Sequence, residues 1–94
     1  MRAKLAIPDH VAELIRGLHP DIKRKVRSAL ESVVDDPLIG KALKDELDGL
    51  RSIRVARFRV IYRIREGRAI EVVSVGPRKS IYEETLRLLR RDER

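Results

Sequence analysis

The chain has 94 residues, no cysteine and two histidines, and its formal net charge at pH 7 is +7. This length suits a single small domain, residues 1–94. The composition excludes a disulfide framework, a thiolate metal site and a histidine-built metal cage. The lack of a long apolar run excludes a membrane span, and we expect a cytoplasmic protein without a cofactor. The basic charge points to nucleic acid or an acidic protein as partner.

The first third of the chain predicts a short strand followed by two helices. Residues 2–7 alternate, with Ala3, Leu5 and Ile7 on one side of the strand. Apolar residues then recur at helical spacing after Pro8, at Val11, Leu14, Ile15 and Leu18, and again after Pro20, at Ile22, Val26, Ala29, Leu30, Val33 and Val34. Two amphipathic helices joined by a few residues predict an antiparallel hairpin whose apolar side needs a partner.

The remainder predicts a three-strand meander and a final helix. Residues 38–49 are mixed, with one helical turn expected over 41–46. Strands are predicted over 50–55, 58–65 and 69–75, with a tight connection at 56–57 and a hairpin turn at 66–68, where Gly67 supplies a positive φ. Gly76-Pro77 is expected to end the sheet. The last helix is predicted over 81–91, after Ser80 as N-cap, with a frayed tail at 90–94.

The strand over 58–65 has one apolar side and one basic side. Phe58, Val60, Tyr62 and Ile64 fall on the first side, and Tyr62 is expected in the core. The second side holds Ile61 and the arginines Arg57, Arg59, Arg63 and Arg65. Residues 51–68 contain seven arginines and one acid, which is +6 of the net +7. This segment therefore predicts a cationic surface that binds a polyanion.

These elements predict an α+β fold in the order β-α-α-β-β-β-α. An antiparallel sheet of about four strands would pack on the N-terminal helix hairpin, because both apolar stripes otherwise remain in water. The other face of the sheet is expected to be open and to carry Arg54, Arg59 and Arg63. Two readings of these arginines remain open: a solvated sheet face, or a surface that binds RNA phosphate.

The element order, the segment LRSIRVARFRVIYRI (residues 50–64) and the segment SVGPRKSIYE (residues 74–83) resemble the RelE/ParE superfamily of bacterial and archaeal toxins, and the RelE branch best. The resemblance spans residues 5–89. It implies the toxin of a type II toxin–antitoxin system, a ribosome-dependent endoribonuclease that cleaves mRNA without a metal. In such enzymes the ribose 2′-hydroxyl attacks the adjacent phosphate.

The resemblance also implies a site on the open sheet face. Arg54 and Arg59 would clamp the phosphate, Arg78 would lie by the leaving 5′-oxygen, and Tyr82 would stack on a base. Further RNA contacts are expected from Arg51, Arg57 and Arg63. Guanidinium groups suit this chemistry because they bind a phosphate bidentately and keep their protons.

The sequence departs from the family pattern at the proton-transfer groups. The founding bacterial enzymes have a further lysine near Ser52, and related enzymes have a glutamate near Ala42 and a histidine near Tyr82. Lysine, unlike arginine, can release its proton near neutral pH when other positive charges surround it. Lys44, which resembles a lysine of some members, and Lys79 therefore remain as candidates for the base or the proton donor.

The resemblance implies three partners: a cognate antitoxin with an acidic, amphipathic segment, the ribosome with its mRNA, and operator DNA through the antitoxin only. Two alternatives stay open, a ParE-like poison of DNA gyrase and a decayed toxin that acts only as co-repressor. Other polar residues have simpler readings. His10 and His19 are expected to be exposed, Tyr82 could instead pack on the sheet edge, and the acids over 35–48 suit caps and turns.

Overall fold

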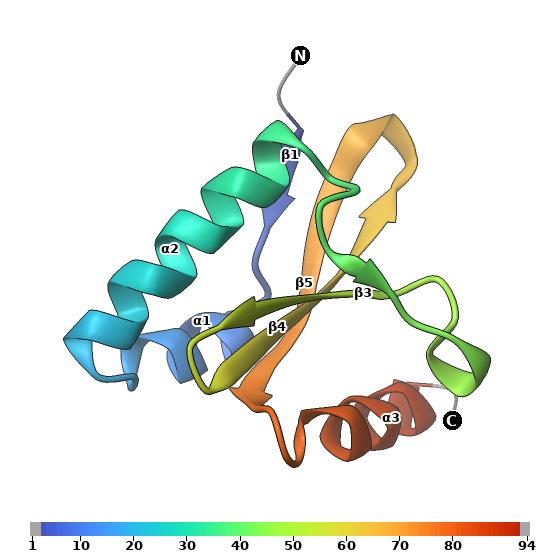
Figure 1. Ribbon diagram of the computed structural model, residues 1–94. Coiled ribbons are helices and arrows are strands. Elements are labelled where there is room, and N and C mark those ends of the chain that lie inside the picture. Colours follow the sequence, from blue (N-terminus) through green and yellow to red (C-terminus); the bar gives the residue numbers. More distant parts are fainter. Residues whose placement is uncertain (1–2, 93–94) are drawn as a thin grey trace.

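The computed structural model describes residues 3–92, so Arg2 of the predicted first strand and residues 93–94 of the predicted frayed tail lie outside the described part (Figure 1). The elements along the chain are β1 (Lys4–Ala6), α1 (Asp9–Arg16), α2 (Pro20–Asp35), β2 (Lys41–Ala42), β3 (Arg51–Val55), β4 (Phe58–Arg65), β5 (Ala69–Pro77) and α3 (Ile81–Asp92), with short 3-10 segments at Asp45–Leu47 and Glu66–Arg68. The predicted α+β class and element order are confirmed. None of the helices within this part is long and apolar enough to cross a bilayer.

The described strands form one mixed sheet in the order β1-β5-β4-β3-β2. The prediction of an antiparallel sheet of about four strands needs two corrections. The two-residue strand β2 adds a fifth strand at one edge, and β1 pairs in parallel with β5 at the other edge. The parallel pairing joins segments about 65 residues apart (Lys4 with Ala69), and local periodicity contains no information on such a distant register.

The helix hairpin covers one face of the sheet, as predicted. Val11 of α1 and Val26 and Leu30 of α2 pack on Val60 and Val72, and all five are buried. Figure 1 shows α1 and α2 on one side of the strands and α3 on the other side. Most of the buried hydrophobic residues cluster on this face. Each fully buried Val or Leu contributes roughly 1.5–3 kcal/mol to the stability of the fold.

The opposite face is not open, and this part of the prediction was wrong. Helix α3 packs across it, where Ile81 joins Leu50 and Ile61 in a buried cluster. At a bulge between Ile61 and Tyr62 the pairing with β5 shifts by one residue, from Ser74 to Val72, which leaves Val73 as the extra residue. Val73 contacts the same cluster, and Ser74 bonds Thr85 of α3 at 2.7 Å. The apolar residues Leu50, Ile61 and Val73 on this face are what α3 covers.

Several element bounds differ from the sequence prediction. Residues 41–42 are an edge strand rather than part of a helical turn, which appears only at Asp45–Leu47 and as a 3-10 segment. Strand β5 continues through Gly76 to Pro77. A Cβ at Gly76 would lie 2.9 Å from Ile81 Cδ1, so glycine leaves room for α3 at this position. Helix α3 extends to Asp92, past the predicted start of fraying at 90. Gly67 has the predicted positive φ, at 72°.

Tyr62 is wholly buried, as predicted, and fixes the connection between α2 and β2. Its hydroxyl donates to the Pro37 carbonyl at 2.7 Å and accepts from the Gly40 N–H at 2.9 Å. Burial raises the pKa of the Tyr62 phenol above its usual value of 10.0, against the opposing effect of the Gly40 hydrogen bond. The phenol therefore remains a donor at neutral pH.

Substituting Gly40→Ala should destabilise the fold. The added Cβ would lie 2.5 Å from the Tyr62 hydroxyl oxygen and 2.8 Å from its ring, and the buried ring has no space to retreat. We expect the free energy of unfolding in urea to fall by about 1–3 kcal/mol. Gly17→Ala is the matched control, since its Cβ would come no closer than 3.7 Å to other atoms. Equal stability of the two variants would contradict the close contact.

Candidate functional site

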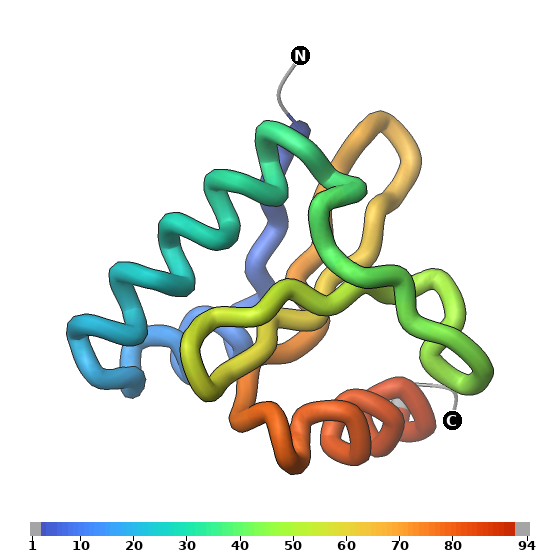
Figure 2. Tube along the Cα trace, viewed as in Figure 1, coloured from blue at the N-terminus to red at the C-terminus, as the bar shows by residue number. Residues whose placement is uncertain are grey.

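Four arginines gather at the end of the sheet where β3 turns into β4. Arg54 and Arg59 are direct partners across these strands, and Arg57 lies in the turn between them. The backbone N–H of Arg78, just after β5, donates to the Arg57 carbonyl at 2.9 Å. Figure 2 shows this turn (yellow) beside the chain that leaves β5 (orange). We call Arg54, Arg57, Arg59 and Arg78 the arginine surface.

The arginine surface is a concentration of uncompensated charge. Among the described residues, none of the ion pairs includes one of its four members. Like charges directly opposite in a sheet destabilise it, and the Arg54–Arg59 pair is of this kind. The folded protein therefore holds these cations together at a cost, and an anion bound between them would relieve it.

Arg59 is the most constrained of the four. It is half-buried, and its Nη1 donates to Ser52 Oγ at 3.2 Å. Its Nε is buried and has no hydrogen-bond partner within the described part of the chain. Buried donors are normally paired, so the guanidinium is held in place with binding capacity unused. Arg54 is exposed, and its Nε makes only a long contact of 3.4 Å to the Ala56 carbonyl.

Tyr82 comes to this region from the first turn of α3. Its hydroxyl donates to Ser52 Oγ at 3.4 Å, so Tyr82 and Arg59 share one partner. The ring is partly buried and also packs on the cluster under α3. It borders a hollow of about 380 Å³, lined further by Lys41, Ala42, Leu43, Lys44, Asp45 and Leu47. Tyr82 therefore packs against the fold in part, and its predicted stacking on a base stays a prediction.

Ser52 is the residue of this site that the prediction missed. It is 2% exposed and accepts hydrogen bonds from Arg59 of β4 and Tyr82 of α3. The alternation of β3 had placed Ser52 on the same side as Arg54, which was a usable signal. What the sequence could not show was that α3 would return over this face.

Two of the arginines predicted to bind RNA contact other groups of the fold instead. Arg51 pairs with Tyr62, on the hairpin side, and its Nη1 donates to the carbonyls of Leu38 at 3.2 Å and Gly40 at 2.7 Å. Arg63 forms an ion pair with Glu71 of β5. Arg51 therefore lies on the opposite side of the sheet from the arginine surface, whereas Arg63 lies on the same side with its charge paired, so we expect neither to bind RNA phosphate.

The Glu71 carboxylate should make stability depend on pH. Burial alone would raise its pKa, but hydrogen bonds and charge from Arg63 and Arg65 outweigh this and lower the pKa of Glu71 below 4.5. The stabilising contribution is thus present above about pH 4.5 and is lost as the pH falls through the lowered value. We expect the stability advantage of wild type over Glu71→Gln, measured by urea unfolding, to shrink as the pH falls. A constant difference would contradict this ion pair.

The two candidate lysines lie in different segments of the chain. Lys79 follows Arg78 in the turn before α3 and is exposed. Lys44 precedes the 3-10 segment, is exposed, and lines the hollow beside Tyr82. Lys79 thus comes three residues before Tyr82 in the sequence, Lys44 lines the hollow that Tyr82 borders, and the roles of both stay predictions.

The other polar residues conform to their simpler readings. His10 and His19 are exposed, and His19 Nδ1 accepts the Asp21 N–H as cap of α2 at 3.2 Å. Within residues 3–92, histidine and acidic side chains nowhere form a group of three that could hold a metal. What the α3 side of the sheet does offer is a set of cations near one aromatic ring, with Arg59 linked to Tyr82 through Ser52.

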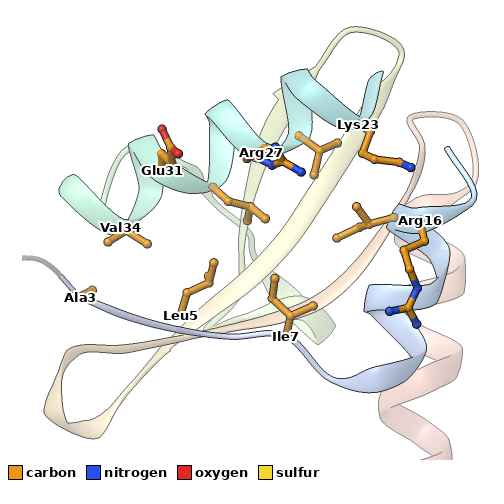
Figure 3. Close-up of a pocket in the computed structure, with 11 residues that line it drawn as sticks. Ala3, Leu5, Ile7, Arg16, Lys23, Arg27, Glu31 and Val34 are labelled. Atoms are coloured by element: carbon orange, nitrogen blue, oxygen red, sulfur yellow. The ribbon is translucent and has the colours of Figure 1, made fainter. Parts of the chain in front are cut away.

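A second feature lies on the hairpin side. Figure 3 shows Leu5 and Ile7 pointing toward α2 across a groove of about 590 Å³. Leu5 and Ile7 are 39% and 36% exposed, although they share the predicted apolar side of β1. The lining also includes Ala3, Ile15, Val26, Leu30 and Val34, and the charged residues Arg16, Lys23, Arg27 and Glu31. The groove is therefore apolar, with three cations and one anion around it.

Comparison with known proteins bears on both features. A family model described as the ParE toxin of the type II toxin–antitoxin system, parDE, matches residues 6–82. Among curated proteins no significant match was found.

Solved structures share the fold. A chain of the RelBE2 toxin–antitoxin complex from Mycobacterium tuberculosis is 26% identical, with a TM-score of 0.73, over 83% of this chain and 100% of that one. A mutant of the E. coli toxin RelE in the free state is 20% identical, with a TM-score of 0.76, over 93% and 97%. A chain of the YoeB–YefM complex from Staphylococcus aureus is 18% identical, with a TM-score of 0.66, over 80% and 95%.

Proposed function

The chain belongs to the ParE toxin family of type II toxin–antitoxin systems, within the RelE/ParE superfamily, and we propose that within this superfamily it acts as an endoribonuclease that cleaves mRNA on the ribosome. The observation that carries this proposal is the juxtaposition of Arg54 and Arg59, which lack ion pairs within the described chain, with the ring of Tyr82. Cations bind phosphate groups and an aromatic ring stacks on a base. A single-stranded RNA presents phosphates and unstacked bases together.

In the proposed reaction, the ribose 2′-oxygen forms a bond to the adjacent phosphorus as the bond from phosphorus to the 5′-oxygen breaks. The products are a 2′,3′-cyclic phosphate and a 5′-hydroxyl end. Negative charge builds up on the phosphate oxygens in the transition state, where Arg54 and Arg59 would donate hydrogen bonds. Nucleophile and phosphate belong to one nucleotide, so much of the catalysis is alignment of the strand, which Tyr82 would supply by stacking on a base.

Two protons must move in this reaction. One leaves the 2′-hydroxyl, and one reaches the 5′-oxygen. The guanidinium groups of the arginine surface keep their protons at neutral pH, so we assign these transfers to Lys44 and Lys79, while Arg78 stabilises the leaving oxygen. The position of Lys44 beside the Tyr82 hollow supports its assignment.

We propose further that the partner of the groove between β1 and α2 is an acidic, amphipathic segment of the cognate antitoxin. Apolar side chains would fill the hollow along Leu5 and Ile7, and acids would face Arg16, Lys23 and Arg27. Several of the similar solved structures are toxins bound to antitoxins, which supports a partner of this kind. This places the antitoxin contact on the side of the sheet away from the arginine surface.

A ParE-like poison of DNA gyrase is the alternative function. The matching family model, which carries the ParE name, favours it. The arginine surface with Tyr82 favours RNA cleavage instead, since a phosphodiester and a base are what this set can bind. A co-repressor that acts on operator DNA only through the antitoxin would need neither.

A primer-extension map of mRNA on translating ribosomes, after induction without antitoxin, tests the proposal. We expect cuts within codons on the ribosome and a halt in translation. Intact mRNA together with a DNA-damage response would show gyrase poisoning. Intact mRNA with normal growth would leave the co-repressor role.

A further inference from the structure

Ser52 occupies the centre of the described site without being able to reach a ligand. Its side chain is 2% exposed, so it lies beneath the surface that RNA would contact. It nevertheless bonds the two residues that would hold RNA, Arg59 Nη1 at 3.2 Å and the Tyr82 hydroxyl at 3.4 Å. Arg59 belongs to β4 and Tyr82 to α3, so one hydroxyl connects side chains from two elements that meet only through tertiary packing.

We propose that Ser52 is a positioning residue, which fixes Arg59 and Tyr82 relative to each other so that phosphate and base are held at one spacing. This inference rests on the proposed RNA cleavage. A serine hydroxyl can accept two hydrogen bonds, and here both acceptor sites are used by functional side chains. Among the described residues, Ser52 is the hydrogen-bond acceptor that holds the Arg59 guanidinium, through Nη1, while the buried Nε has no partner.

The geometry distinguishes this role from general packing. Ser52 and Ser74 are both paired with Ile61, on the strands to either side, so the two serines lie in one row under α3. Ser74 is equally buried, at 3%, and bonds Thr85 of α3 at 2.7 Å. Ser74 therefore links the sheet to α3 as Ser52 does. Among the hydrogen bonds within residues 3–92, however, it makes none to Arg59 or Tyr82. Ser74→Ala is a matched control for Ser52→Ala.

We expect Ser52→Ala to lower the maximal rate of mRNA cleavage on programmed ribosomes by about tenfold to a hundredfold, the range that a small misplacement of catalytic groups produces. Affinity for the ribosome should not change, since Ser52 touches no RNA. Ser74→Ala should leave the rate as in wild type while lowering thermal stability at least as much as Ser52→Ala.

A second measurement does not depend on activity. The chain has two tyrosines, Tyr62 and Tyr82, so a sample labelled with ¹³C at tyrosine Cζ gives two resonances. Ser52→Ala should shift the resonance of Tyr82, which loses its hydroxyl partner, and leave that of Tyr62. Ser74→Ala should leave both in place.

The outcomes separate this inference from the proposed function. Ser52→Ala and Ser74→Ala proteins that cleave equally fast, or a Tyr82 resonance that does not move in Ser52→Ala, would overturn the positioning role alone. A wild-type protein that cleaves no ribosome-bound mRNA would overturn the proposed function, and with it the positioning role of Ser52 in that reaction.

Discussion

Substituting Arg59→Ala should lower the rate of mRNA cleavage on the ribosome by about 10²–10³-fold, the loss observed when one preorganised donor to a developing oxyanion is removed. Arg59 is half-buried and its Nη1 is held by Ser52, so its guanidinium is preorganised to donate to a phosphate oxygen. The double variant Arg59→Ala with Arg78→Ala should also relieve growth arrest in cells that express the protein without antitoxin. Primer extension and growth curves measure the two effects.

Arg63→Ala is the matched control for this prediction. Arg63 lies four residues along the same strand and on the same side as Arg59, and its removal changes the net charge equally. Its guanidinium, however, is paired with Glu71. Cleavage by Arg63→Ala should therefore stay near the wild-type rate, while its stability falls as the ion pair is lost. Equal losses of activity in Arg59→Ala and Arg63→Ala would mean that total charge matters and that the arginine surface is not a specific site.

The contrast between these two arginines also shows where sequence reasoning ended. Alternation along residues 58–65 placed Arg59 and Arg63 correctly on one side of β4, and the bounds of this strand were predicted to the residue. Their different environments depend on cross-strand partners. Gly76 lies opposite Arg59 and leaves it no counter-ion, whereas Glu71 lies opposite Arg63. Register between strands decides this, and the pattern of one strand does not contain it.

The docking of helix α3 on the sheet could not be predicted from the sequence either. Its extent was predicted well from Ile81 onward, but its docking site was not, because Ile61 appeared as one apolar residue among arginines. In the structure Ile61, Leu50 and Ile81 form a buried cluster that sets α3 across the sheet. This docking brings Tyr82 to Ser52, so the apolar cluster determines where the aromatic ring of the site lies.

The two proposed binding sites thus lie on opposite faces of the sheet. On the α3 side, arginines that form no ion pair within residues 3–92 lie near the ring of Tyr82, and on the hairpin side an apolar groove is bordered by cations. An antitoxin segment in the groove would not need to touch the arginine surface to bind tightly. Tests of binding and tests of cleavage should therefore respond to different substitutions.

Substituting Leu5→Glu should weaken binding of the proposed cognate antitoxin by about 100-fold or more. The change places a carboxylate in the apolar groove, where it would be buried without a partner on binding and would repel acidic residues of the antitoxin. Leu5 is 39% exposed in the free protein, so the fold should tolerate the change. Isothermal titration with the purified proteins measures the dissociation constant, and mRNA cleavage should stay at the wild-type rate.

Leu14→Glu is the control, because Leu14 is also an exposed leucine, at 51%, and lies in α1 outside the residues that line the groove. It makes the same change in charge and hydrophobicity, and antitoxin affinity should remain at the wild-type value. If Leu5→Glu binds antitoxin as tightly as Leu14→Glu does, the antitoxin does not use the groove. The cations Arg16, Lys23 and Arg27 would then have to be explained without an acidic partner at this position.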